Sequence, residues 1–160
     1  MKKIKILAGV AGVGKSTYIN QHKKENDLVL SSDQLRIELY GNLEEGNKYN
    51  GEVFNEVNNR LRQAIKTHDG DIYYDTTAVS RKQRAGLYKQ IKKTAELNDY
   101  EIEVVLLHKS LEQIKEQNNE RTGFARVPDD VVERMYKALQ APRIGVDCDS
   151  FRVVAPDFSE

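Results

Sequence analysis

The chain has 160 residues, 39% of them hydrophobic, which is the size of one globular domain that buries much of its surface on folding. Its 25 basic residues balance 25 acidic ones, so net charge supplies no general attraction to nucleic acid or to an anionic membrane. No stretch approaches the roughly 20 apolar residues of a membrane span. We therefore expect a single domain over residues 1–160, in a cytoplasmic protein without a membrane partner, and leave the oligomeric state open.

Five short apolar runs alternate with longer helical patterns along the chain. The runs predict strands of a buried parallel sheet at residues 4–8, 28–30, 72–74, 102–107 and 151–154. Between them, apolar residues recur at helical spacing over residues 49–65, 87–95 and 131–139. Ser110 and Gln113 form a capping-box pattern, which predicts that another helix starts there. The alternation predicts an α/β domain with a roughly five-stranded parallel sheet built by right-handed crossovers.

The first predicted strand is followed by a phosphate-binding pattern, and ligands of such folds bind beyond the carboxyl ends of the strands. Residues 9–16, GVAGVGKS, match G-x-x-x-x-G-K-[ST] between a strand and a helix. Lys15 would bridge the β- and γ-phosphates, and the Ser16 hydroxyl would ligate Mg²⁺. We therefore predict a P-loop that binds a nucleoside triphosphate, ATP, together with Mg²⁺, through Gly9, Gly12, Val13, Gly14, Lys15, Ser16 and Thr17.

The second predicted strand is followed by SSDQLRIELYG, residues 31–41. Asp33 and Arg36 lie three apart and would share one face of a helix that starts near Ser32. A carboxylate there can take a proton from an attacking hydroxyl, while the arginine holds a phosphate of the acceptor. The alternative is an acidic residue that favours the first helical turn, with Arg36 as its surface ion partner. Placement beside the phosphate loop favours the first interpretation.

Four segments resemble, in order and spacing, the kinase domain of phage-type and bacterial polynucleotide kinases. They are GVAGVGKSTYIN, SSDQLRIELYG, YYDTTAVSRKQR and NNERTGFARVPDDVVERMY. The resemblance implies transfer of the ATP γ-phosphate to a 5'-hydroxyl end of DNA or RNA, with Asp33 as general base and Arg36 bound to a phosphate of the terminal nucleotide. Related kinases of small molecules share much of this pattern. A kinase of a nucleoside, sugar or antibiotic is therefore the alternative, and a nucleotide-binding regulatory protein is a less expected one.

Asp75 falls where the family resemblance places an acidic residue after the third strand. The resemblance implies that it supports either the acceptor-side arginine or the metal shell, and the sequence leaves both open. The family commonly has Asp, any residue, then Asn in this motif, whereas this chain has Asp75, Thr76 and Thr77. A threonine lacks the paired donor and acceptor of an amide, so the departure weakens the substrate assignment more than the reaction class.

The segment ERTGFARVP lies between two predicted helices and places Gly123 between Arg121 and Arg126. This pattern predicts a mobile lid whose guanidinium groups reach the nucleotide phosphates when it closes. Arg121 matches the lid arginine of the family and would neutralise charge on the transferred group, whereas a surface role for Arg126 is equally open.

Two further features concern charge and redox chemistry. Residues 76–95 contain six basic residues and no acidic one, which indicates either a solvated helix face or a surface that guides an anionic polymer. The single cysteine, Cys148, has acidic neighbours that disfavour a thiolate, so we predict an inert thiol.

Overall fold

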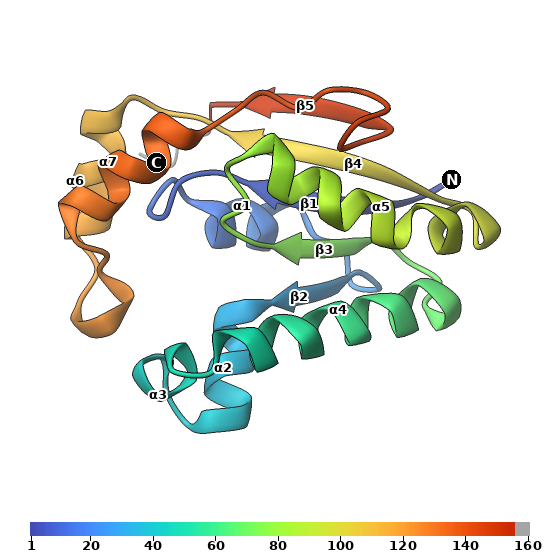
Figure 1. Cartoon of the computed structure of the whole chain (residues 1–160), viewed down its shortest axis with the longest axis horizontal. Coiled ribbons are helices and arrows are strands. Elements are labelled where there is room, and N and C mark those ends of the chain that lie inside the picture. Colours follow the sequence, from blue (N-terminus) through green and yellow to red (C-terminus); the bar gives the residue numbers. More distant parts are fainter. Residues whose placement is uncertain (156–160) are drawn as a thin grey trace.

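The computed structural model describes residues 1–155, so residues 156–160 of the predicted domain lie outside the described part of the chain. Its five strands are β1 (Lys2–Ala8), β2 (Leu28–Ser31), β3 (Ile72–Asp75), β4 (Tyr100–Leu107) and β5 (Ser150–Val154). All are parallel, in the order β2-β3-β1-β4-β5 (Figure 1). The five predicted strands and the α/β fold class are confirmed.

The helices alternate with these strands as the apolar spacing predicts. They are α1 (Lys15–His22), α2 (Ser32–Tyr40), α3 (Leu43–Asn47), α4 (Asn50–Thr67), α5 (Arg81–Leu97), α6 (Leu111–Asn119) and α7 (Asp129–Ala138). The predicted capping box is confirmed, because Ser110 and Gln113 exchange side chain to backbone hydrogen bonds at the start of α6. Two elements were not predicted: the short helix α3, and a 3-10 turn over Gly123–Ala125.

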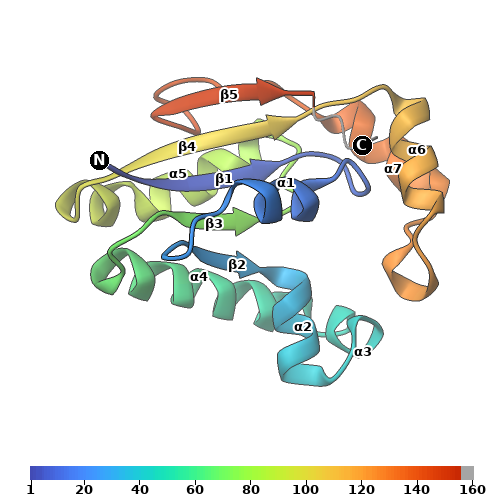
Figure 2. The ribbon, with the colours of Figure 1, turned by 180° about the vertical axis from the view of Figure 1, so that it is seen from behind.

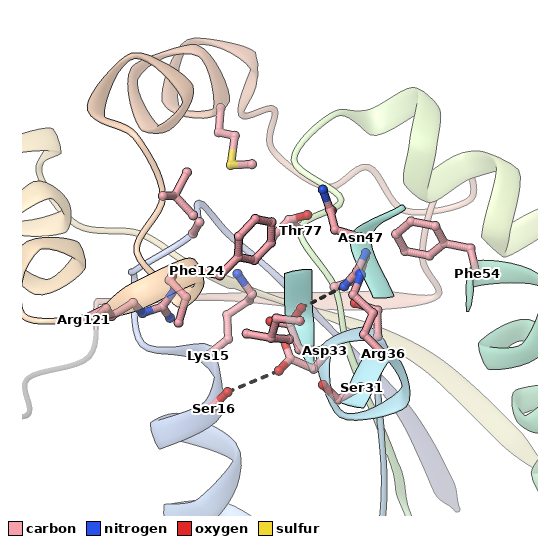
Figure 3. Close-up of a pocket in the computed structure, with 18 residues that line it drawn as sticks. Lys15, Ser16, Ser31, Asp33, Arg36, Asn47, Phe54, Thr77, Arg121 and Phe124 are labelled. Atoms are coloured by element: carbon pink, nitrogen blue, oxygen red, sulfur yellow. Dashed lines mark hydrogen bonds and ion pairs between the residues drawn. The ribbon is translucent and has the colours of Figure 1, made fainter. Parts of the chain in front are cut away.

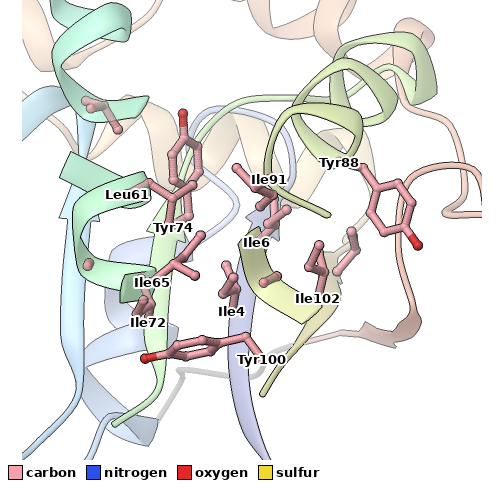
Figure 4. Packing of buried hydrophobic residues seen from close by; sticks show 14 of the residues in the cluster. Ile4, Ile6, Leu61, Ile65, Ile72, Tyr74, Tyr88, Ile91, Tyr100 and Ile102 are labelled. Carbon is pink, nitrogen blue, oxygen red and sulfur yellow. The ribbon is translucent and has the colours of Figure 1, made fainter. Parts of the chain in front are cut away.

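Two apolar clusters hold the helices against opposite faces of the sheet, because successive residues of a strand point to opposite faces. On one face, Ile4 and Ile6 of β1 pack with residues of α4 and α5, among them Leu61, Ile65 and Ile91 (Figure 4). On the other, Leu7 and Val105 belong to a cluster with Tyr18 and Ile19 of α1, Ile114 of α6 and Val132 of α7. Figures 1 and 2 show the resulting three layers, with α4 and α5 together on one side and α1 on the other.

One predicted property of the sheet is wrong. The apolar run at residues 151–154 led us to expect a buried strand, but Phe151 is 43% and Val153 57% exposed. The reason is position: β5 lies at the edge of the sheet and pairs with β4 alone within the described residues. None of the helices in residues 1–155 combines the length and the hydropathy that a membrane crossing requires.

Arg84 of α5 is fully buried and joins three separate segments of the chain. Its Nε donates to Asp147 Oδ2 at 2.7 Å, and both side chains are inaccessible to solvent. Its other nitrogens donate to the carbonyl oxygens of Val79, at 2.9 Å, and of Gln140. A buried charge is tolerated when it is paired and hydrogen-bonded in this way. Arg84 is therefore a structural residue, which removes one member of the basic stretch from contact with any ligand.

Cys148 follows Asp147 and is also fully buried. Burial, with the nearby Asp147 carboxylate, raises the pKa of its thiol to about 11. Because the thiolate is the reactive form, this agrees with the predicted inert thiol.

The buried pair generates a stability prediction. Arg84→Met leaves Asp147 as an uncompensated buried charge, so we expect the free energy of unfolding to fall by about 3 to 5 kcal/mol in urea titrations. Lys93→Met on the solvent side of the same helix is the matched control, and its unfolding free energy should stay close to the wild-type value. Equal stability of the two variants would contradict the structural role of Arg84.

Candidate active site

The carboxyl ends of β1, β2 and β3 meet at one edge of the sheet and form the wall of a cavity. Asp75, the last residue of β3, is in register with Leu7 of β1 and with Ser31 of β2. The phosphate loop, Asp75 and the start of α2 therefore converge. The cavity has a volume of about 230 Å³. It is lined by residues from these loops, from α3, α4 and α7, and from the predicted lid (Figure 3): Ala11, Lys15, Ser16, Ser31, Ser32, Asp33, Arg36, Leu43, Asn47, Phe54, Asp75, Thr76, Thr77, Arg121, Phe124, Ala125, Val127 and Met135.

The predicted phosphate loop connects β1 to the N-terminus of α1. Gly14 caps this helix in the left-handed conformation, with φ 104°, which a glycine adopts without strain. Gly12 has φ 90°, and a Cβ there would lie 3.0 Å from the Cβ of Asn118, so a side chain at this position would strain the backbone and crowd Asn118. Val13 is buried in the core, and Thr17 is exposed on α1. Because no side chain of residues 1–155 caps α1, its first N–H groups remain available to an anion.

Lys15 is buried in this loop and points back at it. Its Nζ donates to the carbonyl oxygen of Gly9 at 3.1 Å and to that of Val10 at 3.5 Å. Burial lowers the pKa of the ammonium group, and the nearby positive charge of Arg121 lowers it further, against the opposing attraction of Asp75. A buried ammonium whose partners are neutral carbonyls gains much from an anion beside it, so the site favours phosphate.

Asp75 lies beside Ser16 at the end of β3. The Ser16 hydroxyl donates to Asp75 Oδ2 at 3.3 Å. Burial raises the pKa of the Asp75 carboxyl, and the positive charge of Lys15 partly offsets this. Within residues 1–155, Arg36 bonds to other side chains and not to Asp75. Of the two roles that the family resemblance leaves open, this geometry favours the metal shell.

The oxygen atoms of Ser16 and Asp75 fit Mg²⁺, which prefers oxygen ligands and usually keeps several waters and substrate phosphates in its shell. The described residues contain no group of three or more histidine, cysteine, aspartate or glutamate side chains that could hold a metal alone. A cation bound here would therefore take most of its ligands from the nucleotide and from water.

Asp33 and Arg36 share the first turns of α2, as predicted. The Ser31 side chain fixes the start of the helix by accepting the Gln34 N–H at 3.3 Å. Arg36 Nη1 donates to Asp33 Oδ1 at 2.8 Å. Their environments differ, because the Asp33 side chain is 70% exposed and that of Arg36 only 11%. The alternative of an exposed surface pair therefore does not describe Arg36.

Three residues that hold Arg36 in place were not predicted from the sequence. Asn50 Oδ1 accepts from Arg36 Nε at 3.1 Å and from Nη2 at 2.9 Å. The Phe54 ring lies 5.4 Å from the guanidinium carbon (Figure 3). Gly46 of α3 packs directly on Arg36, since a Cβ on Gly46 would lie 2.3 Å from the Cβ of Arg36. The only sequence signal was the spacing of Asn50 and Phe54 on one helical face; their meeting with Arg36 depends on tertiary packing.

The predicted lid places its two arginines differently. Arg121 lines the cavity, and its Nη1 donates to the Ala125 carbonyl at 3.3 Å. Arg126 does not line the cavity and donates to Asn119 Oδ1 at 2.8 Å. The buried amide of Asn118 closes the base of this loop, because it accepts the Val127 N–H at 3.0 Å and donates to the Val127 carbonyl. Phe124, 51% exposed, also faces the cavity.

The phosphate loop and the parallel sheet together define a P-loop kinase-like α/β domain. Residues 4–142 match the family model described as an AAA domain, so the chain belongs to that family. No curated protein matches the chain in a sequence search.

Solved structures share this fold at low sequence identity. The RNA repair complex Pnkp1/Rnl/Hen1 contains a chain that is 19% identical over 86% of this chain, with a TM-score of 0.67. A sugar kinase from Janibacter sp. is 16% identical over 97% of this chain and 86% of its own, also with a TM-score of 0.67. A gluconokinase from Sinorhizobium meliloti is 20% identical over 99% of this chain and 83% of its own, with a TM-score of 0.58. The present chain spans 44% of the RNA repair chain.

The contact of Gly46 with Arg36 is testable by a matched pair of substitutions. Gly46→Ala forces a methyl group against the Arg36 backbone and Cβ, so we expect a loss of about 1 to 3 kcal/mol in the free energy of unfolding. Gly51→Ala in α4 meets open space and should be neutral or stabilising by up to about 1 kcal/mol. Urea titration of both variants tests this, and a stable Gly46→Ala protein would show that α3 does not pack on α2 as described.

Proposed function

We propose that this chain is an ATP-dependent, Mg²⁺-dependent kinase that transfers the γ-phosphate to a 5'-hydroxyl end of DNA or RNA. The observation that carries the proposal is the fixed guanidinium of Arg36 beside Asp33. A base and an anion clamp on one helix suit an acceptor that carries a hydroxyl and a phosphate close together. The neighbour from an RNA repair complex is in keeping with such an acceptor.

The donor side of the proposed reaction uses the phosphate loop. Lys15 and the N–H groups at the start of α1 bind the β- and γ-phosphates. Ser16 and Asp75 would hold Mg²⁺, which would supply positive charge to neutralise the phosphates. Arg121, which already lines the cavity, compensates the charge that builds on the transferred group when the lid closes.

Asp33 is the proposed general base. Its Oδ1 binds Arg36, which leaves Oδ2 for the acceptor hydroxyl. The 5'-oxygen forms its bond to the γ-phosphorus while the bond from that phosphorus to the bridging oxygen of ADP breaks, and the hydroxyl proton passes to Asp33. Arg36 binds the phosphate of the acceptor's terminal nucleotide and so holds the hydroxyl in line.

A kinase of a small anionic metabolite is the second candidate. It is favoured by the likeness to a gluconokinase and a sugar kinase, which extends over 99% and 97% of this chain. A sugar acid would offer Arg36 a carboxylate in place of a phosphate. A regulatory protein that binds ATP without transferring its phosphate is a third class, and turnover alone separates it from both kinases.

The reaction is tested by transfer of labelled γ-phosphate from ATP with Mg²⁺ to 5'-hydroxyl DNA and RNA oligonucleotides, with gluconate and neutral sugars in parallel. We expect transfer to the oligonucleotides. Asp33→Asn should lower kcat by about 10² to 10⁴ while ATP affinity is unchanged, because the amide keeps a hydrogen-bond acceptor for Arg36 but cannot take a proton. Transfer to gluconate alone would establish the second candidate, and loss of ATP binding in Asp33→Asn would remove its role as base.

Asn50 is expected to act through Arg36. Asn50→Ala removes two hydrogen bonds to the guanidinium, so KM for the acceptor should rise about tenfold or more, with a smaller change in kcat. Asn50→Gln keeps a neutral amide oxygen as the acceptor and should restore part of the affinity. Steady-state kinetics at saturating ATP measure both variants. An unchanged KM in Asn50→Ala would show that Arg36 does not need this partner.

A further inference from the structure

A second cavity, of about 340 Å³, lies between α4 and α5 beside the active-site cavity. Phe54, Thr76 and Thr77 line both cavities. In Figure 3, Phe54 lies on the opposite side of Arg36 from Lys15. A ligand whose reactive end is at Asp33 and whose phosphate is at Arg36 can therefore extend over Phe54 into the second cavity.

The second cavity combines aromatic surface with side-chain amides. Phe54 is 36% exposed and offers an aromatic face, whereas Tyr74, which also belongs to the lining, is only 5% exposed. Asn58, Gln83 and Gln90 line the same space. The Tyr74 hydroxyl donates to Asn58 Oδ1 at 2.8 Å, which orients the Asn58 amide so that its nitrogen is left to donate. Aromatic faces stack on nucleobases, and amides bond to base edges, so this lining suits a nucleobase better than a sugar.

Lysines of α5 form a stripe next to this cavity. Lys82, Gly86, Lys89 and Lys93 follow one another at spacings of four, three and four residues, which places them on one face of the helix. Gly86 lines the cavity, and the three lysines are exposed.

The other cations of α5 are already engaged. Arg84 pairs with Asp147, Lys92 pairs with Glu96 and Asp149, and Arg81 donates to the Ala141 carbonyl. Lys82, Lys89 and Lys93, the lysine stripe, make no ion pair within residues 1–155. They therefore present uncompensated positive charge on the face of α5 that also carries Gly86, next to the residues that line the second cavity.

We propose that the cavity between α4 and α5 binds the acceptor strand beyond its terminal nucleotide. A base stacks against Phe54 among the amides, and the following phosphates lie along the lysine stripe. The ligand class is single-stranded nucleic acid. This inference rests on the proposed function and deepens it, because it divides the acceptor site into a subsite for the reacting nucleotide and one for the strand that follows.

The proposal predicts a gain from acceptor length. We compare kcat/KM for a nucleoside 3'-monophosphate, which reaches Arg36 only, with that for a hexanucleotide of the same 5' base. For the wild-type protein, kcat/KM should be higher for the hexanucleotide by a ratio of about ten or more, which is the gain expected from stacking one base on an aromatic side chain. Gly86→Leu fills the open space at this glycine and should bring the ratio close to one. Gln90→Ala should lower the ratio by a smaller factor. It replaces Gly86→Leu as the test if circular dichroism shows that Gly86→Leu does not fold.

The lysine stripe is tested by salt. For the hexanucleotide, Lys89→Met should weaken the dependence of log KM on log salt concentration by about 0.7, the value for one phosphate contact on a single strand. Lys66→Met, an equal loss of charge on an exposed part of α4 that lines neither cavity, should leave the slope unchanged.

The outcomes distinguish the two proposals. Absence of transfer to every 5'-hydroxyl acceptor, with ATP still bound, overturns the proposed function and this inference with it. Transfer at equal kcat/KM to the mononucleotide and the hexanucleotide overturns this inference alone, as does a length gain that both cavity variants keep. A gain lost in Gly86→Leu and a reduced slope in Lys89→Met support it.

Discussion

The register that aligns Asp75 with Leu7 on one side and with Ser31 on the other is the constraint on which the site depends. Parallel strands end at the same edge of a sheet, so three loops that are far apart in sequence begin side by side, at neighbouring strand ends about 5 Å apart. The pairing of β3 with β1 therefore places the Asp75 carboxylate next to the Ser16 hydroxyl. A shift of one residue in β3 would turn that carboxylate to the other face of the sheet.

Three buried cations, Arg84, Lys15 and Arg36, differ in how fully their charge is compensated. Arg84 has a buried carboxylate and several carbonyls as partners, so its charge is compensated inside the fold. Within residues 1–155, Lys15 donates hydrogen bonds only to neutral carbonyls, and Arg36 donates to one exposed carboxylate and one amide. The second and third cations also line the cavity, where they leave part of their charge for a ligand. We therefore propose Lys15 and Arg36, and not Arg84, as the cations that bind a ligand.

Sequence reasoning succeeded where the signal is local. Strand runs, helical spacing, the Ser110 capping box and the phosphate loop are all short-range patterns, and the structure contains each of them. It did not find Asn50 or Phe54, because their importance comes from the packing of α4 against Arg36. Nor could the sequence separate the structural cation of α5 from the exposed ones. Arg84 and the lysine stripe are all basic residues of one helix, and only the fold shows that Arg84 is buried and the three lysines are exposed. The edge position of β5 likewise depends on strand order, which apolar content does not encode.

The burial of Cys148 makes the protein well suited to fluorescence spectroscopy. It is the only cysteine in the chain, and a thiol that is fully buried reacts slowly with maleimide dyes, the more so when burial raises its pKa to about 11. A cysteine introduced at exposed Phe124 would thus be labelled selectively without first replacing the native one. A dye at that position would lie on the Gly123–Ala125 turn, where a change in its emission on addition of nucleotide would test whether this segment moves.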